Sequence, residues 1–229
     1  MDLPELRAEI SMQALDLMHY DGLNIADGEL GLGETFFQEL QKKVLFPLLS
    51  ANLFKNKKPL GQEYCIKHFA EFKVGVIGLV SPSYFNSELL AKEDLEVKDP
   101  EKTLKEILPK VNAQADIIIL LSHLGKNETT LLLQKVPGVD VAIIGHDPGM
   151  LNQPELLAKT ILVQNSTQGK HLGILDLTIG TKGAIESYTG SMVSITENSP
   201  QDPEVFALMR ELEKKKNSQH PRTEKKLPE

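Results

Sequence analysis

The amino-acid sequence predicts an α/β protein built as a layered sandwich, and not a simple doubly wound sheet. Strand-helix-strand units in the sequence are mixed with consecutive strands that are expected to pair antiparallel. Within the strand-helix-strand part, two apolar runs each end in a histidine, one in Ser122-His123 and the other in Gly145-His146. Ligands bind outside the carboxyl ends of the strands in open α/β sheets, so these histidines are candidate metal ligands.

The first half of the chain is predicted to open with an amphipathic helix. Apolar residues recur at helical spacing from Leu6 to Met18, and the helix is expected to close at His19 and Tyr20. The following elements are predicted in order: a short strand at 22–26, a glycine-rich loop at 27–33, a helix at 34–44, an apolar strand at 46–53, and a hairpin of strands 63–69 and 73–80.

The second half contains the two strands that end in histidine. A helix at 102–115 precedes them, with Pro109 as a kink or boundary, and a helix through 128–135 separates them. The remaining elements are predicted as a short helix near 154–159, a strand at 160–164, a strand at 169–179 that pairs through a turn at 180–183 with 184–195, and a helix at 203–216.

The composition excludes several classes of protein. The chain has 32 acidic and 25 basic residues, so the broad positive surface of a nucleic-acid-binding protein is absent. No apolar stretch approaches the roughly 18–20 residues of a membrane span. Cys65 is the only cysteine, which excludes a disulfide framework and a multi-cysteine metal site; its alternating surroundings predict a buried structural thiol. The N-terminus lacks a signal-peptide pattern, so the protein is expected in the cytoplasm if Met1 is the true start.

Six segments in the same order resemble the metallophosphoesterase (calcineurin-like) superfamily, and within it the catalytic domain of the 5'-nucleotidase family. The resemblance covers most of residues 8–195. Leu121-Ser122-His123-Leu124-Gly125 resembles a Leu-Ser-His-x-Gly ligand loop, and Gly145-His146-Asp147-Pro148 resembles a Gly-His-x-His loop. The other four segments are 20–33, similar to a Gly-Asn-His-Glu-Phe-Asp-x-Gly loop with its helix and strand, 49–52, 74–79 and 164–176.

The resemblance implies a layered α/β/β/α sandwich and phosphate-ester hydrolysis by two metal ions about 4 Å apart. The chain departs from the family pattern in three places. The family's Asp-x-His and Gly-Asp motifs would lie upstream of Met1, so the sandwich is expected to be N-terminally truncated. The family's Asn-His pair is replaced by Asp27-Gly28, and the second histidine of Gly-His-x-His is replaced by Pro148.

The surviving ligand set implied by the resemblance is Asp27, His123 and His146. Two histidines and a carboxylate suit zinc, manganese or iron(II), and at most one divalent metal is expected. Competing structural roles stay open: a hydrogen-bonded histidine at either strand end, and a turn or helix cap for Asp27. Glu29 is expected to be solvated, or to contact a metal-ligating side chain without binding the metal itself. No catalytic residue is assigned.

Residues outside this set have simpler explanations. His19, His68, His171 and His220 are expected to be structural or exposed, and turn formation explains Asn52 and Asn165. The predicted organisation is a metallophosphoesterase-like domain at 1–198, a C-terminal helix at 199–216 and a disordered basic tail at 217–229.

Three functional interpretations follow. The favoured one is a catalytically impaired or degenerate domain kept as a binding module. The second is an active metal-dependent phosphoesterase acting on a phosphomonoester such as a nucleotide. The third is part of a longer polypeptide, in which exposed sheet edges would require a homo-oligomer or a missing N-terminal partner segment. If the resemblance extends to secreted 5'-nucleotidases with an upstream signal, the location would be periplasmic or extracellular.

Overall fold

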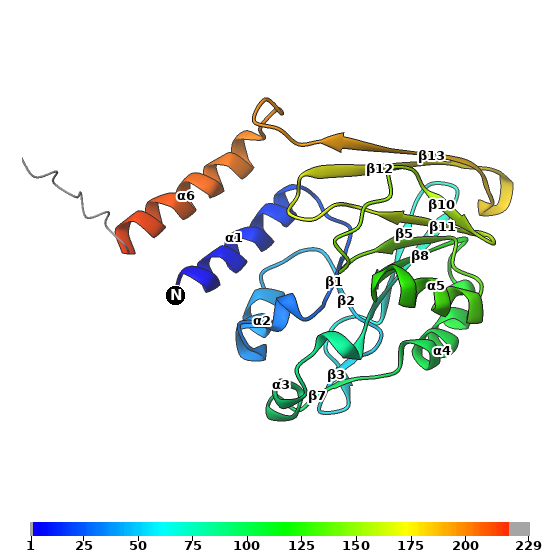
Figure 1. The fold of residues 1–229 in the computed structure, drawn as a ribbon, viewed down its shortest axis with the longest axis horizontal. Coiled ribbons are helices and arrows are strands. Elements are labelled where there is room, and N and C mark those ends of the chain that lie inside the picture. The colour runs from blue at the N-terminus through cyan, green and yellow to red at the C-terminus, as the bar shows by residue number, and fades with distance from the viewer. Residues whose placement is uncertain (1, 220–229) are drawn as a thin grey trace, which may run out of the picture. The chain divides into compact units, whose positions relative to one another are not determined.

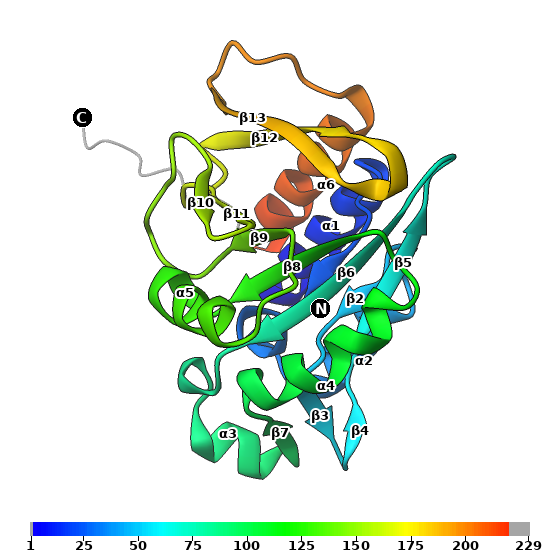
Figure 2. The ribbon, with the colours of Figure 1, turned by 90° about the vertical axis from the view of Figure 1, so that its right-hand side faces the viewer.

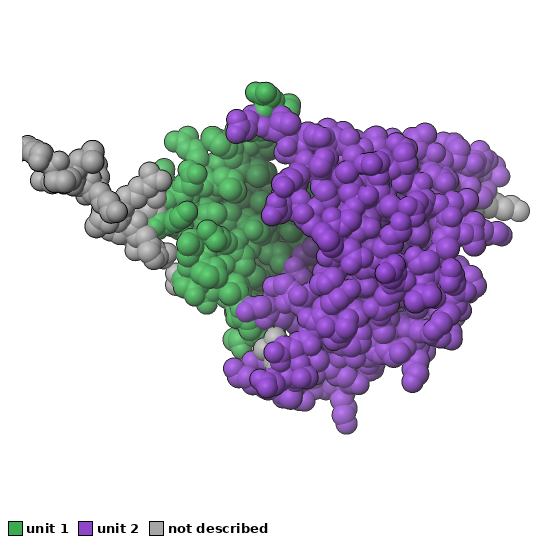
Figure 3. Space-filling view, viewed as in Figure 1, with its two compact units in different colours: residues 1–21, 32–46, 198–229 green, residues 22–31, 47–197 purple. Residues whose placement is uncertain are grey.

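The computed structural model of the chain describes residues 2–219 and divides them into two compact units (Figures 1 and 3). The first unit comprises residues from 1–21, 32–46 and the segment after 197, and the second comprises 22–31 and 47–197. Residues 220–229, and with them most of the predicted basic tail at 217–229, lie outside the described residues.

The first unit is helical. It contains α1 (Leu3–Leu17), α2 (Glu34–Gln41) and α6 (Pro203–Gln219), and α1 lies alongside α6. A capping box starts α1: Asp2 accepts a hydrogen bond from the Glu5 amide, and Glu5 accepts one from the Asp2 amide, each at 3.0 Å. The predicted helices are confirmed, and α6 continues three residues beyond its expected end at 216.

The second unit is built on a six-stranded sheet. The strands lie in the order β10 (Glu155–Leu157), β11 (Thr160–Gln164), β9 (Val141–Ile144), β8 (Ile117–His123), β6 (Lys73–Val80) and β5 (Tyr64–His68). The four central strands are parallel, and β10 and β5 pair antiparallel at the edges. The buried centre of the sheet explains the nearly continuous apolar runs of β8 and β9.

Helices α4 (Pro100–Asn112) and α5 (Gly125–Lys135) cover one face of this sheet (Figure 2). The Asp99 side chain caps α4 by accepting a hydrogen bond from the Lys102 amide at 2.8 Å, and the helix continues through Pro109. The main core lies between the helices and the sheet. Its fully buried residues include Ile77, Leu79, Leu104, Val111 and Leu120. Each such side chain contributes roughly 1.5–3 kcal/mol by leaving water.

The opposite face is covered by the parallel pair β1 (Leu23–Asn24) and β2 (Leu48–Leu49). Two glycines in β6 allow the layers on either side to pack closely against this strand. A Cβ at Gly75 would collide with the Val111 side chain of α4, and a Cβ at Gly78 would collide with the Asn24 side chain of β1. Because the helix and the β1–β2 pair approach opposite faces of one strand, the predicted layered arrangement is confirmed.

Some predicted elements differ from the structure. The prediction of a helix at 154–159 is wrong, because this stretch forms β10. Ala158, with a φ of 53°, lies in the tight turn that joins β10 to β11. The single strand expected at 46–53 is divided into β2 and β3 (Leu53–Lys55), because the Asn52 side chain occupies the junction. In place of strand pairing, the Asn52 amide group donates to the Val80 carbonyl and accepts from the Val80 amide.

Further elements complete the unit. The hairpin of β12 (His171–Ile179) and β13 (Ile185–Ser194) is confirmed, and β3 forms a small sheet in the order β4 (Lys58–Pro59), β3, β7 (Leu95–Val97). Neither β7 nor α3 (Ser87–Lys92) was predicted. Within residues 2–219, no helix combines the length and apolar character needed to cross a membrane.

Candidate metal centre

His123 is the last residue of β8, and the sheet and the following helix fix its backbone. The Ser81 amide donates to the His123 carbonyl at 3.1 Å, which joins the carboxyl ends of β6 and β8. Next to it along the chain, the hydroxyls of Ser122 and Thr129 lie 2.7 Å apart, and Thr129 donates to the Gly125 carbonyl at 2.6 Å. These bonds hold the His123 backbone and the turn that follows it, and 24% of the His123 side chain stays exposed.

His146 lies in the loop after β9 and is more exposed. Its backbone has a φ of 77°, a region that is strained for a residue with a side chain. The next residue does not face the histidines: the Asp147 carboxylate accepts a hydrogen bond from the Lys126 amide in the first turn of α5. Asp147 thus acts as a helix cap.

Asp27 precedes a short 3-10 turn, Gly28–Leu30, and occupies its N-cap position without a side-chain capping bond. Its Oδ1 instead lies 3.0 Å from Nε2 of His123. The capping role left open by the sequence is therefore not what this side chain does. Glu29 turns its carboxylate to the backbone, where it accepts a hydrogen bond from the Ala26 amide at 2.8 Å.

The three side chains converge. Nδ1 of His146 lies 3.2 Å from Nε2 of His123, and the potential ligand atoms of Asp27, His123 and His146 all lie within 4.8 Å of one another. A single proton on Nε2 of His123 cannot satisfy both neighbours with linear hydrogen bonds. A cation would accept a lone pair from each of the three atoms. Ligand atoms about 2.0–2.1 Å from a tetrahedral metal lie about 3.3 Å apart, which is close to the two distances from Nε2 of His123, 3.0 Å to Asp27 and 3.2 Å to His146.

Tyr84 also belongs to this cluster, and the sequence analysis missed it. It ends the 3-10 turn Pro82–Tyr84 after β6, and its ring stacks on His146 with 3.3 Å between centroids and 17° between planes. Its ring meets His123 edge-on at 5.6 Å. Burial raises the pKa of the Tyr84 hydroxyl, and nearby carboxylates, Asp147 first, raise it further. The usable signal was its position, four residues after the end of a central strand.

The other residues singled out in the sequence are buried or hydrogen-bonded within the fold. Asn52 is fully buried, as described above. The Asn165 amide donates to the His171 carbonyl at 2.8 Å, and the His171 ring lies 2.6 Å from the Ser166 hydroxyl, so both stabilise the start of β12. Cys65 is half-buried in β5.

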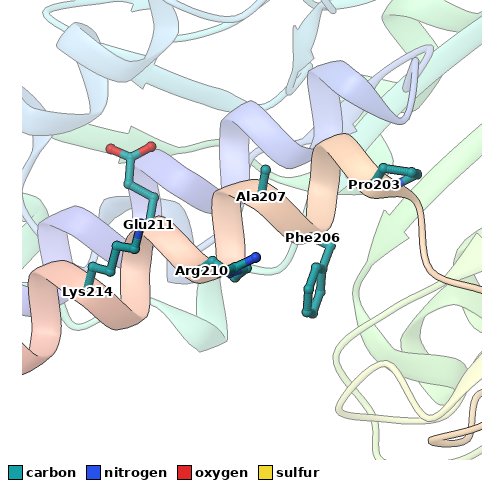
Figure 4. A pocket seen from close by; sticks show the side chains of 6 residues that line it. All are labelled: Pro203, Phe206, Ala207, Arg210, Glu211 and Lys214. Atoms are coloured by element: carbon teal, nitrogen blue, oxygen red, sulfur yellow. The ribbon is translucent and has the colours of Figure 1, made fainter.

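Each unit also has a surface depression. In the first unit one of about 460 Å³ runs along α6, and its described lining residues belong to that helix, with the Phe206 ring on one side of it (Figure 4). The other, of about 610 Å³, lies beside α5 and β10 and contains Leu131, Leu156 and the ion pair of Lys126 with Glu155. Neither brings together a set of groups with evident chemistry.

Comparison with known proteins gives a consistent relationship. No protein-family model matches the chain. The "Uncharacterized metallophosphoesterase YunD" of Bacillus subtilis is 27% identical over 210 residues, covering 89% of this chain and 45% of that protein. The 5'-nucleotidase of Bos taurus is 30% identical over 224 residues, covering 84% of this chain and 38% of that protein. The chain thus spans less than half the length of these relatives.

Solved structures show the same fold. The 5'-nucleotidase precursor from Thermus thermophilus aligns with a TM-score of 0.82 at 22% identity, covering 93% of this chain and 46% of that one. The calcineurin-like phosphoesterase YfkN from Bacillus subtilis aligns with a TM-score of 0.79 at 24% identity, covering 93% of this chain and 77% of that one.

The fold is that of a metallophosphoesterase-type α/β domain. The sequence relatives are named as metallophosphoesterases and 5'-nucleotidases. The chain is therefore related to the metallophosphoesterase (calcineurin-like) superfamily and, within it, to the 5'-nucleotidases.

Proposed function

We propose that this domain binds a single divalent metal through Asp27, His123 and His146 and is catalytically impaired as a phosphoesterase. The convergence of these three side chains, with ligand atoms within 4.8 Å of one another, carries the proposal. Two neutral imidazoles and one carboxylate leave open positions on zinc, manganese or iron(II) for water or a phosphate oxygen. A metal bound there would supply Lewis-acid chemistry and would lower the pKa of a bound water.

The residues around the cluster support impairment. Gly28 and Pro148 offer no side-chain donor at positions where the family pattern has histidines. The carboxylate of Asp147, between His146 and Pro148, accepts a hydrogen bond at the N-terminus of α5. Among residues 2–219, no second cluster of three potential ligands stands beside the first. A phosphate ester that reached the metal would meet one cation, and no histidine at position 28 would assist the leaving group.

Elemental analysis of purified protein dialysed against zinc, manganese or iron(II) tests the metal site. We expect one equivalent per chain, and we expect His123→Ala to reduce it to background. His171→Ala is the matched control, because His171 is hydrogen-bonded to Ser166 in the β12 region and should leave uptake unchanged. Uptake of two equivalents, or none, would contradict the proposal.

An active phosphomonoesterase is the alternative, and the names of the relatives favour it. Those relatives include 5'-nucleotidases, of which this chain spans less than half. Phosphate release from an aryl phosphate and from a nucleoside monophosphate distinguishes the two functions. Impairment predicts no metal-dependent turnover above buffer, whereas turnover that disappears in His123→Ala would establish the active enzyme.

A further inference from the structure

His146 is held in place by something other than its own strand. It lies beyond the end of β9, it is exposed, and its φ of 77° lies in a region that is unfavourable for a non-glycine residue. Such a conformation persists only where the surroundings enforce it. The interaction that covers the imidazole is the Tyr84 ring, nearly parallel to it with 3.3 Å between centroids.

Tyr84 is itself anchored to the more rigid half of the site. Its hydroxyl donates to the Leu124 carbonyl at 2.9 Å, directly after His123. The turn that carries Tyr84 starts at Ser81, whose amide donates to the His123 carbonyl and whose hydroxyl lies 2.8 Å from that of Ser83. The Tyr84 ring is thus fixed to the end of β8 at both its backbone and its hydroxyl.

We infer that Tyr84 is a positioning residue, which holds the His146 imidazole so that its Nδ1 stays beside Nε2 of His123. The inference rests on the proposed single-metal function and adds a residue that the ligand set does not contain. An exposed imidazole free to rotate would have to be ordered when a metal binds, and that ordering would weaken affinity. Because the stack orders the ring in advance, the metal meets a preformed pair of nitrogens.

The test uses zinc affinity of the full chain, measured by competition with a chromophoric chelator. Tyr84→Leu removes the ring and keeps an apolar side chain; we expect zinc to bind roughly 10–100-fold more weakly, as when groups that orient metal ligands are lost. Tyr84→Phe keeps the stack and loses the hydroxyl anchor, and we expect a smaller loss than for Tyr84→Leu. Tyr188→Leu in β13 is the matched control and should bind as wild type.

A double-mutant cycle separates positioning from a general structural effect. If Tyr84 acts through His146, adding Tyr84→Leu to His146→Ala should cause no further loss of zinc affinity. A loss equal to that of Tyr84→Leu alone would overturn the inference. Folded Tyr84→Leu protein that binds zinc within about twofold of wild type would overturn it as well.

Proton NMR of the metal-free protein gives a second readout. The ring current of a stacked tyrosine should shift the His146 ring protons upfield in wild type and in Tyr84→Phe, and Tyr84→Leu should remove the shift while His171 stays unchanged. Unshifted His146 protons in wild type would refute the stack, even if Tyr84→Leu fails to fold. If wild type binds no zinc, the proposed function fails, and this spectrum alone decides whether Tyr84 holds His146.

Discussion

His123 and His146 follow the same sequence pattern, an apolar strand that ends in histidine, but the fold holds them differently. His123 is part of β8, and its backbone carbonyl accepts a hydrogen bond from the Ser81 amide. His146 lies outside β9, has a positive φ and is covered by the Tyr84 ring. The sheet therefore fixes one candidate ligand, and a side chain from another loop fixes the other.

The two histidines are thus fixed in different ways, His123 by strand pairing and His146 by a ring from another loop. His123 also occupies the centre of the cluster, since its Nε2 lies 3.0 Å from Asp27 and 3.2 Å from His146. The turn after His123 is closed by Thr129 and by Asp147, which caps the helix that begins there. A change at His123 should therefore disturb the whole set, and a change at His146 only one side of it.

The largest expected effect is on metal affinity. His123→Ala should weaken zinc binding by more than about a hundredfold, beyond the range for groups that only orient ligands. His146→Ala keeps the Asp27–His123 pair, so it should retain at least about tenfold more affinity than His123→Ala, or about 1.4 kcal/mol. Chelator competition measures both. Equal losses in the two variants would break the comparison.

The next largest effect is on folding stability, and it should differ between the glycines that lie near the two histidines. Gly125 has a φ of 73°, and a Cβ there would lie 2.8 Å from the Asp147 carboxylate. Gly125→Ala should therefore lower the free energy of unfolding by about 1–3 kcal/mol. Gly145→Ala is the matched variant: its Cβ would lie 3.5 Å from Nδ1 of His123, an ordinary contact, so the cost should stay within about 0.5 kcal/mol. Urea denaturation measures both, and a tolerated Gly125→Ala would show that the turn after His123 is adjustable.

Paired substitutions at the histidines sharpen the comparison further. At His146 the positive φ favours glycine, so His146→Gly should be more stable than His146→Ala by about 1 kcal/mol. At His123 the strand favours alanine, so His123→Ala should be more stable than His123→Gly by about 0.5–1 kcal/mol. The sign of the difference should reverse between the positions. The same sign at both would mean that the two backbones are alike in solution.

Much of this site could be predicted from the sequence, because strand ends are a local property. The apolar runs before His123 and His146 indicated two parallel strands, and parallel strands bring their carboxyl ends to one edge of the sheet. The short loop at Asp27 was placed through the family resemblance. The structure brings all three residues together.

Other features depend on contacts between distant segments, which a local pattern does not contain. Tyr84 reaches His146 only because β6, β8 and β9 are neighbours in the sheet. Asn52 replaces strand pairing with bonds to Val80, so a continuous apolar run is divided in two. The residues around Leu156 have helical propensity but form a strand. The segment is short, and its backbone pairs with the edge of β11.

The smallest expected effect concerns Asp140, which ties the start of the His146 strand to the His123 strand. Its carboxylate accepts a hydrogen bond from the Ile118 amide at 2.7 Å, and burial raises its pKa above the ordinary value of 3.8, against the opposing effect of that bond. The folded state then binds more protons than the unfolded state, so this group should lower stability as pH rises from about 3.8 through the raised pKa.

Asp140→Asn keeps an acceptor for Ile118 and removes the titration. We expect the variant to be equally or slightly more stable than wild type at neutral pH, by under about 1 kcal/mol, and to lose that advantage in acid. Zinc affinity should stay unchanged, because the two histidines lie at the far ends of these strands. Urea denaturation across the acidic range checks the sign, with Asp116→Asn as the matched control, since Asp116 makes a similar bond to the Lys73 amide at an exposed position. A variant that is less stable at neutral pH and more stable in acid would show that the charged carboxylate, and not its neutral form, joins the two strands.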